Sequence, residues 1–267
     1  MKVWINSNTK EVSIKTAEKI KQSLLNAGIE IDQKNPDLAI SVGGDGTFLK
    51  TFHEYSDQLA TTRFLGVHTG HLGFYADWRD FEVDELIEAL IHDTKQSITY
   101  PILDVEVTYA DDSVEKIKAL NEAIIKRTSK TMRADVILDN EFFEKFRGDG
   151  LCFSTPSGST AYAKSIGGAV IHPKSHVMQM NEIAPINNRV YRSISAPIIA
   201  PSSQAIEILL APEDDYMVNY DTNSKIDCSL KSVKFQLSNE SIQFAQLRDR
   251  HFWGRVEHAF LGTNDFI

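Results

Sequence analysis

The amino-acid sequence predicts an α/β N-terminal domain followed by a mainly β C-terminal domain. Over the first hundred residues, short β-prone runs alternate with helical runs, and beyond Tyr100-Pro101 the long helical runs nearly disappear in favour of short alternating runs. A chain of 267 residues also exceeds the usual size of one hydrophobic core. We therefore expect an α/β domain at 1–100 and a β domain at 101–248, with the tail at 249–267 packing back on the first domain.

The expected elements of the first domain follow β-α-β order. They are strands at 2–5, 38–42 and 63–68 and helices at 13–27 and 84–91. The first helix is expected to bury one apolar face, formed by Ile14, Ala17, Ile20 and Leu24. Alternation of strands with helices favours a mostly parallel sheet covered by helices, in which ligands bind at the carboxyl ends of the strands.

The expected elements of the second domain are short strands separated by turns. The strands are expected at 105–109, 134–138, 142–147, 151–154, 205–210, 233–237 and 242–247. The turn residues Asp111-Asp112-Ser113 and Asp139-Asn140 separate neighbouring strands. In the tail, Phe252, Trp253, Val256 and Phe260 have near-helical spacing, which favours a packing role for this stretch over RNA binding.

A glycine-rich turn, Gly43-Gly44-Asp45-Gly46-Thr47, directly follows the apolar strand at 38–42, and Thr47 is expected to be the N-cap of a helix. Glycines let backbone N–H groups approach an anion, and the following helix N-terminus favours negative charge, so phosphate is the expected guest. Asp45 would repel that phosphate and is expected to face a hydroxyl or a metal beside it, which indicates phosphoryl transfer. The alternative is a tight structural turn in which Asp45 caps the helix.

Further polar segments follow in the chain. A second glycine loop at Thr69–Phe74 ends the next strand and can line the same crevice. The segment Thr155–Tyr162 offers small hydroxyls, a small Ala161 and an aromatic ring for stacking on a base, although it also fits a Ser/Thr-rich turn before a short helix at 160–165. Asn121 can bond an adenine edge and Glu122 can accept from ribose hydroxyls.

Taken in order, the Gly43–Thr47 turn, Asn121-Glu122, Gly148-Asp149-Gly150 and the Thr155–Tyr162 segment resemble the NAD kinase family, in particular its bacterial branch. The first motif is shared with diacylglycerol and sphingosine kinases and, more loosely, with phosphofructokinases, so the resemblance implies a Rossmann-like first domain. It also implies transfer of a phosphoryl group from ATP or polyphosphate to the 2′-hydroxyl of the adenosine ribose of NAD, which gives NADP.

The resemblance further implies a role for each matching residue. Asp45 is the expected catalytic proton acceptor, with Gly46 keeping the turn open beside it. The remaining residues are expected to bind the dinucleotide: Asn121 and Glu122 the adenosine, Asp149 the nicotinamide side, Arg147 a phosphate, and Thr160, Ala161, Tyr162 and Ser165 the wall of the site, with Phe74, Ser157 and Ala184 as further contacts.

Composition and charge limit the classes of partner that we expect. With 42% hydrophobic and 24% charged residues, a formal net charge of −9 and no apolar segment of membrane-spanning length, we expect a cytoplasmic protein without a nucleic-acid or membrane surface. His68 and His71 lack a third ligand at suitable spacing, so no protein metal site is expected, and Mg²⁺ or another divalent cation is expected to arrive with ATP. The resemblance implies a homo-oligomer, a dimer or tetramer, in which the β domain completes a partner's site.

Two alternatives to an NAD kinase stay open from the sequence. A lipid kinase of the diacylglycerol-kinase type would share the glycine turn and a β-rich second domain. A dinucleotide sensor without catalysis would share the binding pocket. Phosphorylation of diacylglycerol would favour the lipid kinase, and NAD binding without turnover would favour the sensor.

Overall fold

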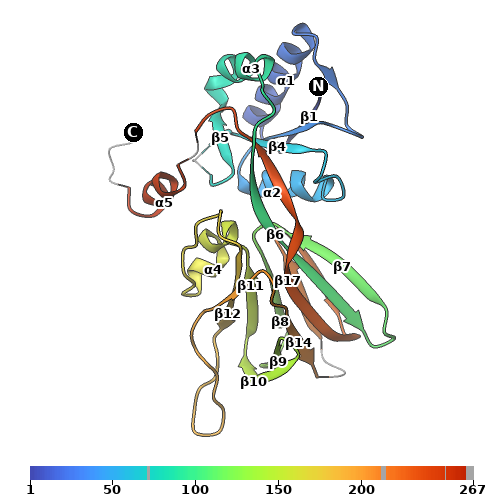
Figure 1. Ribbon diagram of the computed structural model, residues 1–267, viewed down its shortest axis with the longest axis vertical. Coiled ribbons are helices and arrows are strands. Elements are labelled where there is room, and N and C mark those ends of the chain that lie inside the picture. The colour runs from blue at the N-terminus through green and yellow to red at the C-terminus, as the bar shows by residue number, and fades with distance from the viewer. Residues whose placement is uncertain (71–72, 212–214, 250, 263–267) are drawn as a thin grey trace. The chain divides into compact units, whose positions relative to one another are not determined.

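The computed structural model describes residues 1–70, 73–211, 215–249 and 251–262. The chain divides into two compact units, of which the first unit comprises residues 1–100 and 241–267 and the second unit comprises residues 101–240 (Figure 1). Two long strands, β6 (Ser97–Tyr109) and β17 (Leu230–Ala245), have residues in both units.

The first unit is an α/β sheet with helices, as the alternation of apolar runs predicts. Its other elements are β1 (Lys2–Ser7), α1 (Glu11–Asn26), β2 (Glu30–Ile31), β3 (Leu38–Val42), α2 (Asp45–Glu54), β4 (Arg63–His68), β5 (Ala76–Arg79), the 3-10 turn η1 (Asp80–Glu82), α3 (Val83–Ile91) and α5 (Phe252–Phe260). The strands β2, β1, β3 and β4 are neighbours in that order, and β5 and the end of β17 both pair with β4. All of these pairs are parallel. The predicted class of this unit is confirmed.

Helix α1 buries only part of the expected face. Ile20 and Leu24 are buried and Ala17 is partly buried, as expected, whereas Ile14 is 41% exposed and Ser13 and Thr16 are buried in its stead. The helix spans Glu11–Asn26, and Ser13 lies inward because its hydroxyl hydrogen-bonds the Thr69 hydroxyl at 2.6 Å. Each residue of a helix is rotated by about 100° from the one before it, so Ser13 and Ile14 cannot both lie at the centre of one face.

Helix α2 begins three residues earlier than expected. Gly44 is the N-cap residue, and its carbonyl accepts the backbone N–H groups of Thr47 and Phe48. Thr47 is therefore not the N-cap, and it is buried inside the first turn, where its hydroxyl accepts a bond from the side chain of Asn8 at 3.3 Å. The earlier start places Asp45 in the first turn, at the positive end of the helix dipole.

The second unit is built almost entirely of β-strands. Its elements besides β6 and β17 are β7 (Val114–Ala119), β8 (Glu122–Arg127), β9 (Met132–Leu138), β10 (Glu141–Gly148), β11 (Gly150–Ser154), the 3-10 turn η2 (Ser157–Thr160), α4 (Tyr162–Ser165), β12 (Val177–Ile183), β13 (Ile198–Pro201), β14 (Ile206–Leu210), β15 (Tyr216–Tyr220) and β16 (Asn223–Asp227). The prediction of a mainly β second domain is confirmed in its class.

Two antiparallel sheets enclose the core of the second unit. One contains β10, β9, β14 and β17, with β6 and β7 beside β17, and the other has the order β13-β12-β11-β8-β15-β16. Side chains from both sheets meet in one apolar cluster, in which the rings of Phe153 and Phe235 stack with centroids 3.7 Å apart. Burial of this cluster is the main force that holds the two sheets together.

Strand β17 corrects the expectation of two separate strands at 233–237 and 242–247. The polar residues between these runs interrupt the alternation of apolar side chains, but the strand continues through them. Ser238 hydrogen-bonds Asp104 on β6, and Glu240 forms an ion pair with Lys118 on β7 at 2.5 Å, so the polar stretch has partners on neighbouring strands. Hydrophobic periodicity alone does not reveal such polar cross-strand pairs.

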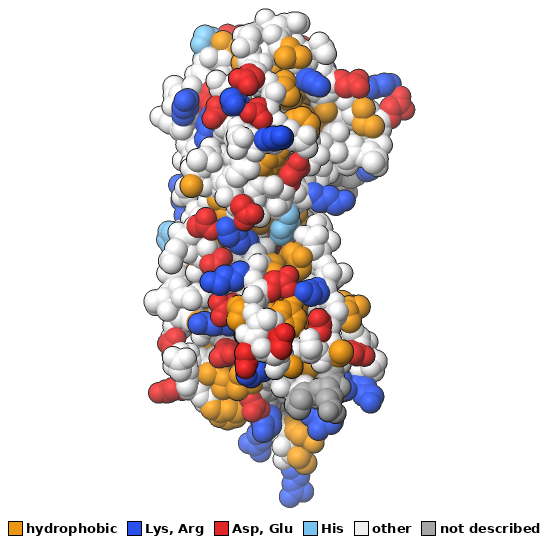
Figure 2. Space-filling model, turned by 90° about the vertical axis from the view of Figure 1, so that its right-hand side faces the viewer, with side chains coloured by type: hydrophobic (Ala, Val, Ile, Leu, Met, Phe, Trp, Pro, Cys, Tyr) orange, Lys and Arg blue, Asp and Glu red, His pale blue; other side chains and the backbone are white. Residues whose placement is uncertain are grey.

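The surface carries charges of both signs. Figure 2 shows acidic and basic side chains interspersed on one face, with hydrophobic side chains between them. Among the helices in the part of the chain that the structure describes, none is long and apolar enough to cross a membrane.

Candidate active site

Asp45 is held by two backbone amides of the loop that follows β4. The N–H of Phe74 donates to Oδ2 at 2.9 Å, and the N–H of Tyr75 donates to Oδ1 at 3.1 Å. Both carboxylate oxygens are thereby oriented, yet Asp45 stays half-buried and Gly46 beside it is exposed. Each oxygen retains a further lone pair, so the carboxylate can still accept a hydrogen bond from a substrate hydroxyl.

Gly73 is a residue that the sequence reasoning did not single out. A Cβ atom added to Gly73 would lie 2.3 Å from Oδ1 of Asp45, so only glycine allows the loop to approach the carboxylate this closely. The signal was the second glycine loop itself, of which residues 71 and 72, including His71, lie outside the described residues. Asp45, Gly46, Gly73 and Phe74 thus form one cluster in the first unit.

The second unit joins two of the predicted segments. The backbone N–H of Thr155 donates to the carbonyl of Asn121 at 2.9 Å, and the Thr155 hydroxyl donates to the carbonyl of Leu120 at 2.6 Å. A Cβ atom at Gly158 would lie 1.9 Å from the Asn121 carbonyl oxygen, which explains why glycine occupies that position. Asn121, Glu122 and the loop after β11 therefore form one rigid polar cluster.

The other predicted residues of this loop lie in η2 and α4. Ser157 and Thr160 are buried, and their hydroxyls donate to the carbonyls of Leu120 and Ser157, at 3.3 Å and 3.1 Å. Ala161 is half-buried at the end of η2, and Ser165 is exposed at the end of α4. Tyr162 is 40% exposed, so its ring is available for stacking on a planar ligand.

Glu122 has an unusual environment. It is buried, and its Oε2 atom has no hydrogen-bond partner among the described residues. Burial, with the nearby charge of Asp221 in addition, raises the pKa of Glu122 to about 8, although the backbone N–H of Tyr162 donates to the carboxyl group and opposes the shift. Near pH 7 this carboxyl group is protonated and can both donate and accept a hydrogen bond.

Asp221 is a second residue that the sequence reasoning missed. Its carboxylate accepts the backbone N–H groups of Leu120 and Asn121 at 2.9 Å and 2.7 Å, and its own N–H donates to the carbonyl of Glu122. Its φ of 49° is the left-handed conformation that Asp tolerates better than most residues. An aspartate between two β-like runs was the available signal, but nothing in the sequence links it to a segment 100 residues away.

Three predicted residues lie at the other end of β11. Ser154 pairs with Glu122 at one end of this strand, whereas Gly150 pairs with Ile183 at the other. Asp149, which is exposed, donates its N–H to the carbonyl of Ile183, next to Ala184 with its φ of 46°. Asp149 lies five residues before Ser154, which corresponds to about 17 Å of extended chain.

Arg147 belongs to this second group. Its guanidinium lies 4.4 Å from the centroid of the Tyr191 ring, and its carbonyl accepts the N–H of Ile186. Its Nε atom has no hydrogen-bond partner among the described residues. We call Arg147, Asp149 and Ala184 the distal group, because the strand β11 separates them from Asn121 and Glu122.

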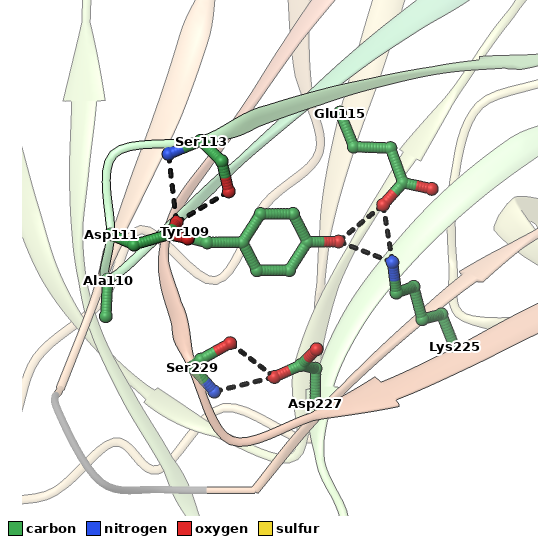
Figure 3. A pocket seen from close by; sticks show the side chains of 8 residues that line it. All are labelled: Tyr109, Ala110, Asp111, Ser113, Glu115, Lys225, Asp227 and Ser229. Atoms are coloured by element: carbon green, nitrogen blue, oxygen red, sulfur yellow. Dashed lines mark hydrogen bonds and ion pairs between the residues drawn. The ribbon is translucent and has the colours of Figure 1, made fainter.

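A separate polar pocket of about 390 Å³ lies between the β6–β7 turn and strand β16 (Figure 3). Lys225 donates to the Tyr109 hydroxyl at 2.6 Å and to Glu115 at 2.5 Å, and Asp111 and Asp227 accept bonds from Ser113 and Ser229. None of the predicted site residues lines this pocket. Asp111 and Asp227 hold turns together, and Glu115 bonds Lys225 and Tyr109.

The described residues contain no cluster of three or more His, Cys, Asp or Glu side chains that could hold a metal ion. Mg²⁺ often binds through one or two carboxylates together with substrate phosphates and waters, so a nucleotide-dependent kinase does not require such a cluster. His68 is buried, and burial lowers its pKa, which favours a neutral ring that hydrogen-bonds the Gly70 carbonyl at 3.0 Å.

A carboxylate at the start of a helix, held beside a glycine turn of a parallel α/β sheet, is the arrangement expected of a phosphotransferase. The model of the ATP-NAD kinase N-terminal domain matches residues 5–95, and that of the ATP-NAD kinase C-terminal domain matches residues 120–247. The chain belongs to the NAD kinase family.

Curated relatives match over the full length. The chain is 52% identical over 268 residues to the NAD kinase of Latilactobacillus sakei subsp. sakei (strain 23K), with 100% of each chain covered. It is 48% identical over 265 residues to the NAD kinase of Enterococcus faecalis (strain ATCC 700802 / V583), which covers 99% of this chain and 100% of the relative.

Solved structures share the fold. The yeast NADH kinase complexed with NADH has a TM-score of 0.86 at 19% identity and covers 100% of this chain and 89% of its own. An NAD kinase from Archaeoglobus fulgidus in complex with ATP has a TM-score of 0.76 at 23% identity and covers 96% of this chain and 99% of its own.

Proposed function

We propose that this chain transfers a phosphoryl group from ATP to the 2′-hydroxyl of the adenosine ribose of NAD, and that Asp45 accepts the proton of that hydroxyl. Membership of the NAD kinase family supports the reaction. The observation that supports the role of Asp45 is its carboxylate, which two backbone amides orient beside an exposed glycine.

In the proposed step, the ribose 2′-oxygen attacks the γ-phosphorus of ATP. The bond between that phosphorus and the β–γ bridging oxygen breaks, so that ADP leaves with the bonding electrons and the hydroxyl proton passes to the Asp45 carboxylate. Because both carboxylate oxygens are already oriented, the rate advantage comes chiefly from positioning. Mg²⁺ or another divalent cation, bound to the phosphates of ATP, would neutralise their charge.

For the nucleoside, we infer binding at the polar cluster around Asn121 and Glu122. The Asn121 side chain can pair with an adenine edge, and a protonated Glu122 can exchange two hydrogen bonds with a diol. Tyr162 offers its partly exposed ring for stacking. Ser157, Thr160, Ala161 and Ser165 supply the wall of this cluster, and we infer that Phe74 is a further contact of the dinucleotide.

The position of the distal group supports a role for it in the site of a neighbouring copy of the chain. Asp149 and Ala184 lie about 17 Å from Glu122 along β11, at the opposite end of the strand. We propose that the protein is a homo-oligomer in which the distal group contacts the nicotinamide side of a dinucleotide held by a second copy of the chain. Arg147 would then neutralise a phosphate of that dinucleotide.

The experiment that tests the proposed function compares the wild-type chain with Asp45→Asn. Purified protein is incubated with NAD, ATP and Mg²⁺, and NADP and ADP are quantified together. We expect stoichiometric NADP and ADP from the wild type and a kcat at least about 100-fold lower for the variant. NADH and polyphosphate in parallel reactions define the acceptor and the donor.

Asp57→Asn serves as the control, because it changes another carboxylate of the first unit that lies outside the Asp45 cluster. An Asp45→Asn variant with the full wild-type rate would overturn the role of Asp45. A wild-type chain that forms no NADP with any donor would overturn the function itself.

A further inference from the structure

Arg255 of helix α5 reaches the loop that orients Asp45. Its Nη1 atom donates to the carbonyl oxygen of Phe74 at 2.5 Å, and its Nη2 atom forms an ion pair with Asp77. All of these residues belong to the first unit. Arg255 lies beyond residue 247, where the match to the family's C-terminal domain ends, so neither domain match includes it.

One peptide group connects Arg255 to Asp45. The carbonyl of Phe74 and the N–H of Tyr75 belong to the same planar peptide unit. Arg255 holds the carbonyl side of this unit, and Oδ1 of Asp45 accepts its N–H at 3.1 Å. A charged donor on the carbonyl polarises the peptide and makes its N–H a better donor, so the two hydrogen bonds reinforce each other.

The position of Arg255 is well defined by burial and charge. Its side chain is 15% exposed and that of Asp77 is 5% exposed. Burial lowers the pKa of Arg255, and the negative charge of Asp45 opposes that shift, which places the guanidinium within electrostatic reach of the catalytic carboxylate. An arginine stays charged throughout the physiological pH range, so the interaction persists.

Helix α5, as the structure describes it, has no fully buried residue, and Trp253 is 58% exposed. The ring of Phe260 lies 5.9 Å from that of Phe74, centroid to centroid, so a second residue of the helix contacts the same loop. Two residues of α5, Arg255 and Phe260, therefore contact the segment that supplies the amides for Asp45.

We propose that Arg255 is a positioning residue for phosphoryl transfer, which aligns Asp45 through the Phe74–Tyr75 peptide. This inference rests on the proposed role of Asp45. A guanidinium that served only to anchor the C-terminal tail would contribute to stability without any selective effect on kcat.

The test uses the full-length chain with Arg255→Gln, Arg255→Lys and the matched variant Arg248→Gln. Arg248 also lies in the 241–267 part of the first unit, but it pairs with Glu82 at 3.0 Å and stacks on Trp78, both of which lie outside the Phe74–Tyr75 peptide. For each variant, kcat, KM for NAD and the midpoint of thermal unfolding are measured.

We expect Arg255→Gln to lower kcat by about 10- to 100-fold, with KM for NAD within about threefold of wild type. Lysine keeps the charge and can bond one of the two acceptors, so Arg255→Lys should recover part of kcat. Arg248→Gln should keep kcat within about twofold of wild type even where its unfolding midpoint falls as far as that of Arg255→Gln.

An Arg255→Gln variant with wild-type kcat would overturn the inference, and so would equal losses of kcat in Arg255→Gln and Arg248→Gln. Should Arg255→Gln fail to fold, Arg255→Lys decides: unchanged kcat overturns the inference, and reduced kcat with unchanged KM supports it. Asp45→Asn measured in parallel separates the two proposals, because a fully active Asp45→Asn overturns the proposed catalytic role whatever Arg255 does.

Discussion

The neighbours of two carboxyl groups of the proposed site act on them in different ways. Asp45 receives two backbone N–H groups, which orient both of its oxygen atoms. Glu122 is buried with one oxygen lacking a partner among the described residues, and burial raises its pKa to about 8. Asp45 is thereby held in one orientation toward a substrate hydroxyl, and Glu122 is suited to donate a hydrogen bond near neutral pH.

A third carboxyl group behaves like Glu122. Burial, reinforced by the neighbouring carboxyl group of Glu182 on β12, raises the pKa of Glu144 on β10 to about 7. Oε2 of Glu182 accepts bonds from the Ser193 hydroxyl and the Ser195 N–H, and Oε2 of Glu144 accepts the N–H of Ile194. The two carboxyl groups therefore hold the 193–195 segment, which lies just before β13.

These raised pKa values predict that stability falls as pH rises. The folded chain keeps protons on Glu122 and Glu144 at pH values where the unfolded chain has lost them, so stability declines between about pH 5 and pH 8 and then levels off. Glu144→Gln, whose amide imitates the protonated carboxyl, should flatten this decline. The thermal unfolding midpoint at pH 5.5, 7 and 8.5 is the measurement.

The control for this pH series is Glu106→Gln. The side chain of Glu106 is 42% exposed, and its carboxylate pairs with Lys116 at 3.9 Å. It should follow the wild-type curve. Stability that rises from pH 5.5 to 8.5 in the wild type, or an undiminished slope in Glu144→Gln, would contradict the assigned protonation states.

Among the elements, the connection between β7 and β8 depends on a residue at the end of β15. Asp221 accepts two backbone N–H groups there and so fixes the direction in which Asn121 and Glu122 leave β7. We expect Asp221→Asn to lower the free energy of unfolding by about 1–3 kcal/mol, because one buried N–H loses its acceptor. It should also raise KM for NAD about tenfold, which corresponds to about 1.4 kcal/mol of lost binding.

Asp227→Asn is the matched control for Asp221. Asp227 also accepts two hydrogen bonds in a turn, from the N–H and the hydroxyl of Ser229, but it lies in the pocket of Figure 3 rather than at the nucleoside cluster. Chemical denaturation and steady-state kinetics are compared for both variants. A KM that changes equally in both, or in neither, would refute the positioning role of Asp221.

Strands and turns differ in how well the sequence predicts them. The apolar runs of β3 and β4 are buried along their whole length, and both were predicted to the residue because turn residues bound them. The start of α2 was wrong by three residues, since Gly44 and Thr47 are both acceptable caps and the Thr47 hydroxyl is bonded to the Asn8 side chain instead of capping the helix. Local patterns determine where an element lies more reliably than where it ends.

The sequence indicates which side chains belong to the candidate site, but not which groups orient them. Asp45 stands out because a carboxylate among glycines is unusual, but its partners are backbone N–H groups 29 and 30 residues away, which no side-chain pattern marks. Asp221 and Arg255 act over still longer separations, through contacts that only the folded chain creates. Sequence reasoning identified groups with obvious chemistry and missed those that orient them.

For the whole molecule, the proposed division of one site between two copies makes a test possible without a structure of the complex. Asp45→Asn and Asp149→Lys chains, each inactive alone, are co-expressed and purified together. If the distal group serves a second copy, a mixed dimer contains one intact site, and random pairing restores about a quarter of wild-type activity.

The matched experiment co-expresses Asp45→Asn with Asn121→Lys. Asn121 and Asp45 are both proposed to act on the substrate bound by their own chain, so this pair of variants should not recover activity. Recovery with Asp149→Lys and none with Asn121→Lys supports the division. No recovery with Asp149→Lys would mean that the distal group acts within its own chain or not at all.

The pairing of β17 with β4 also affects the order in which the chain can fold. Gln243 and Phe244 pair with Arg63 and Phe64, so one edge of the parallel sheet in the first unit is completed by residues near the end of the chain. During synthesis, β5 can pair with residues 66–68 of β4 soon after both have been made, whereas Arg63 and Phe64 have no strand on that side until residues 243 and 244 follow. An apolar strand end that is unpaired during this interval can pair with wrong partners, so the long sequence separation of β4 and β17 favours slow folding and aggregation.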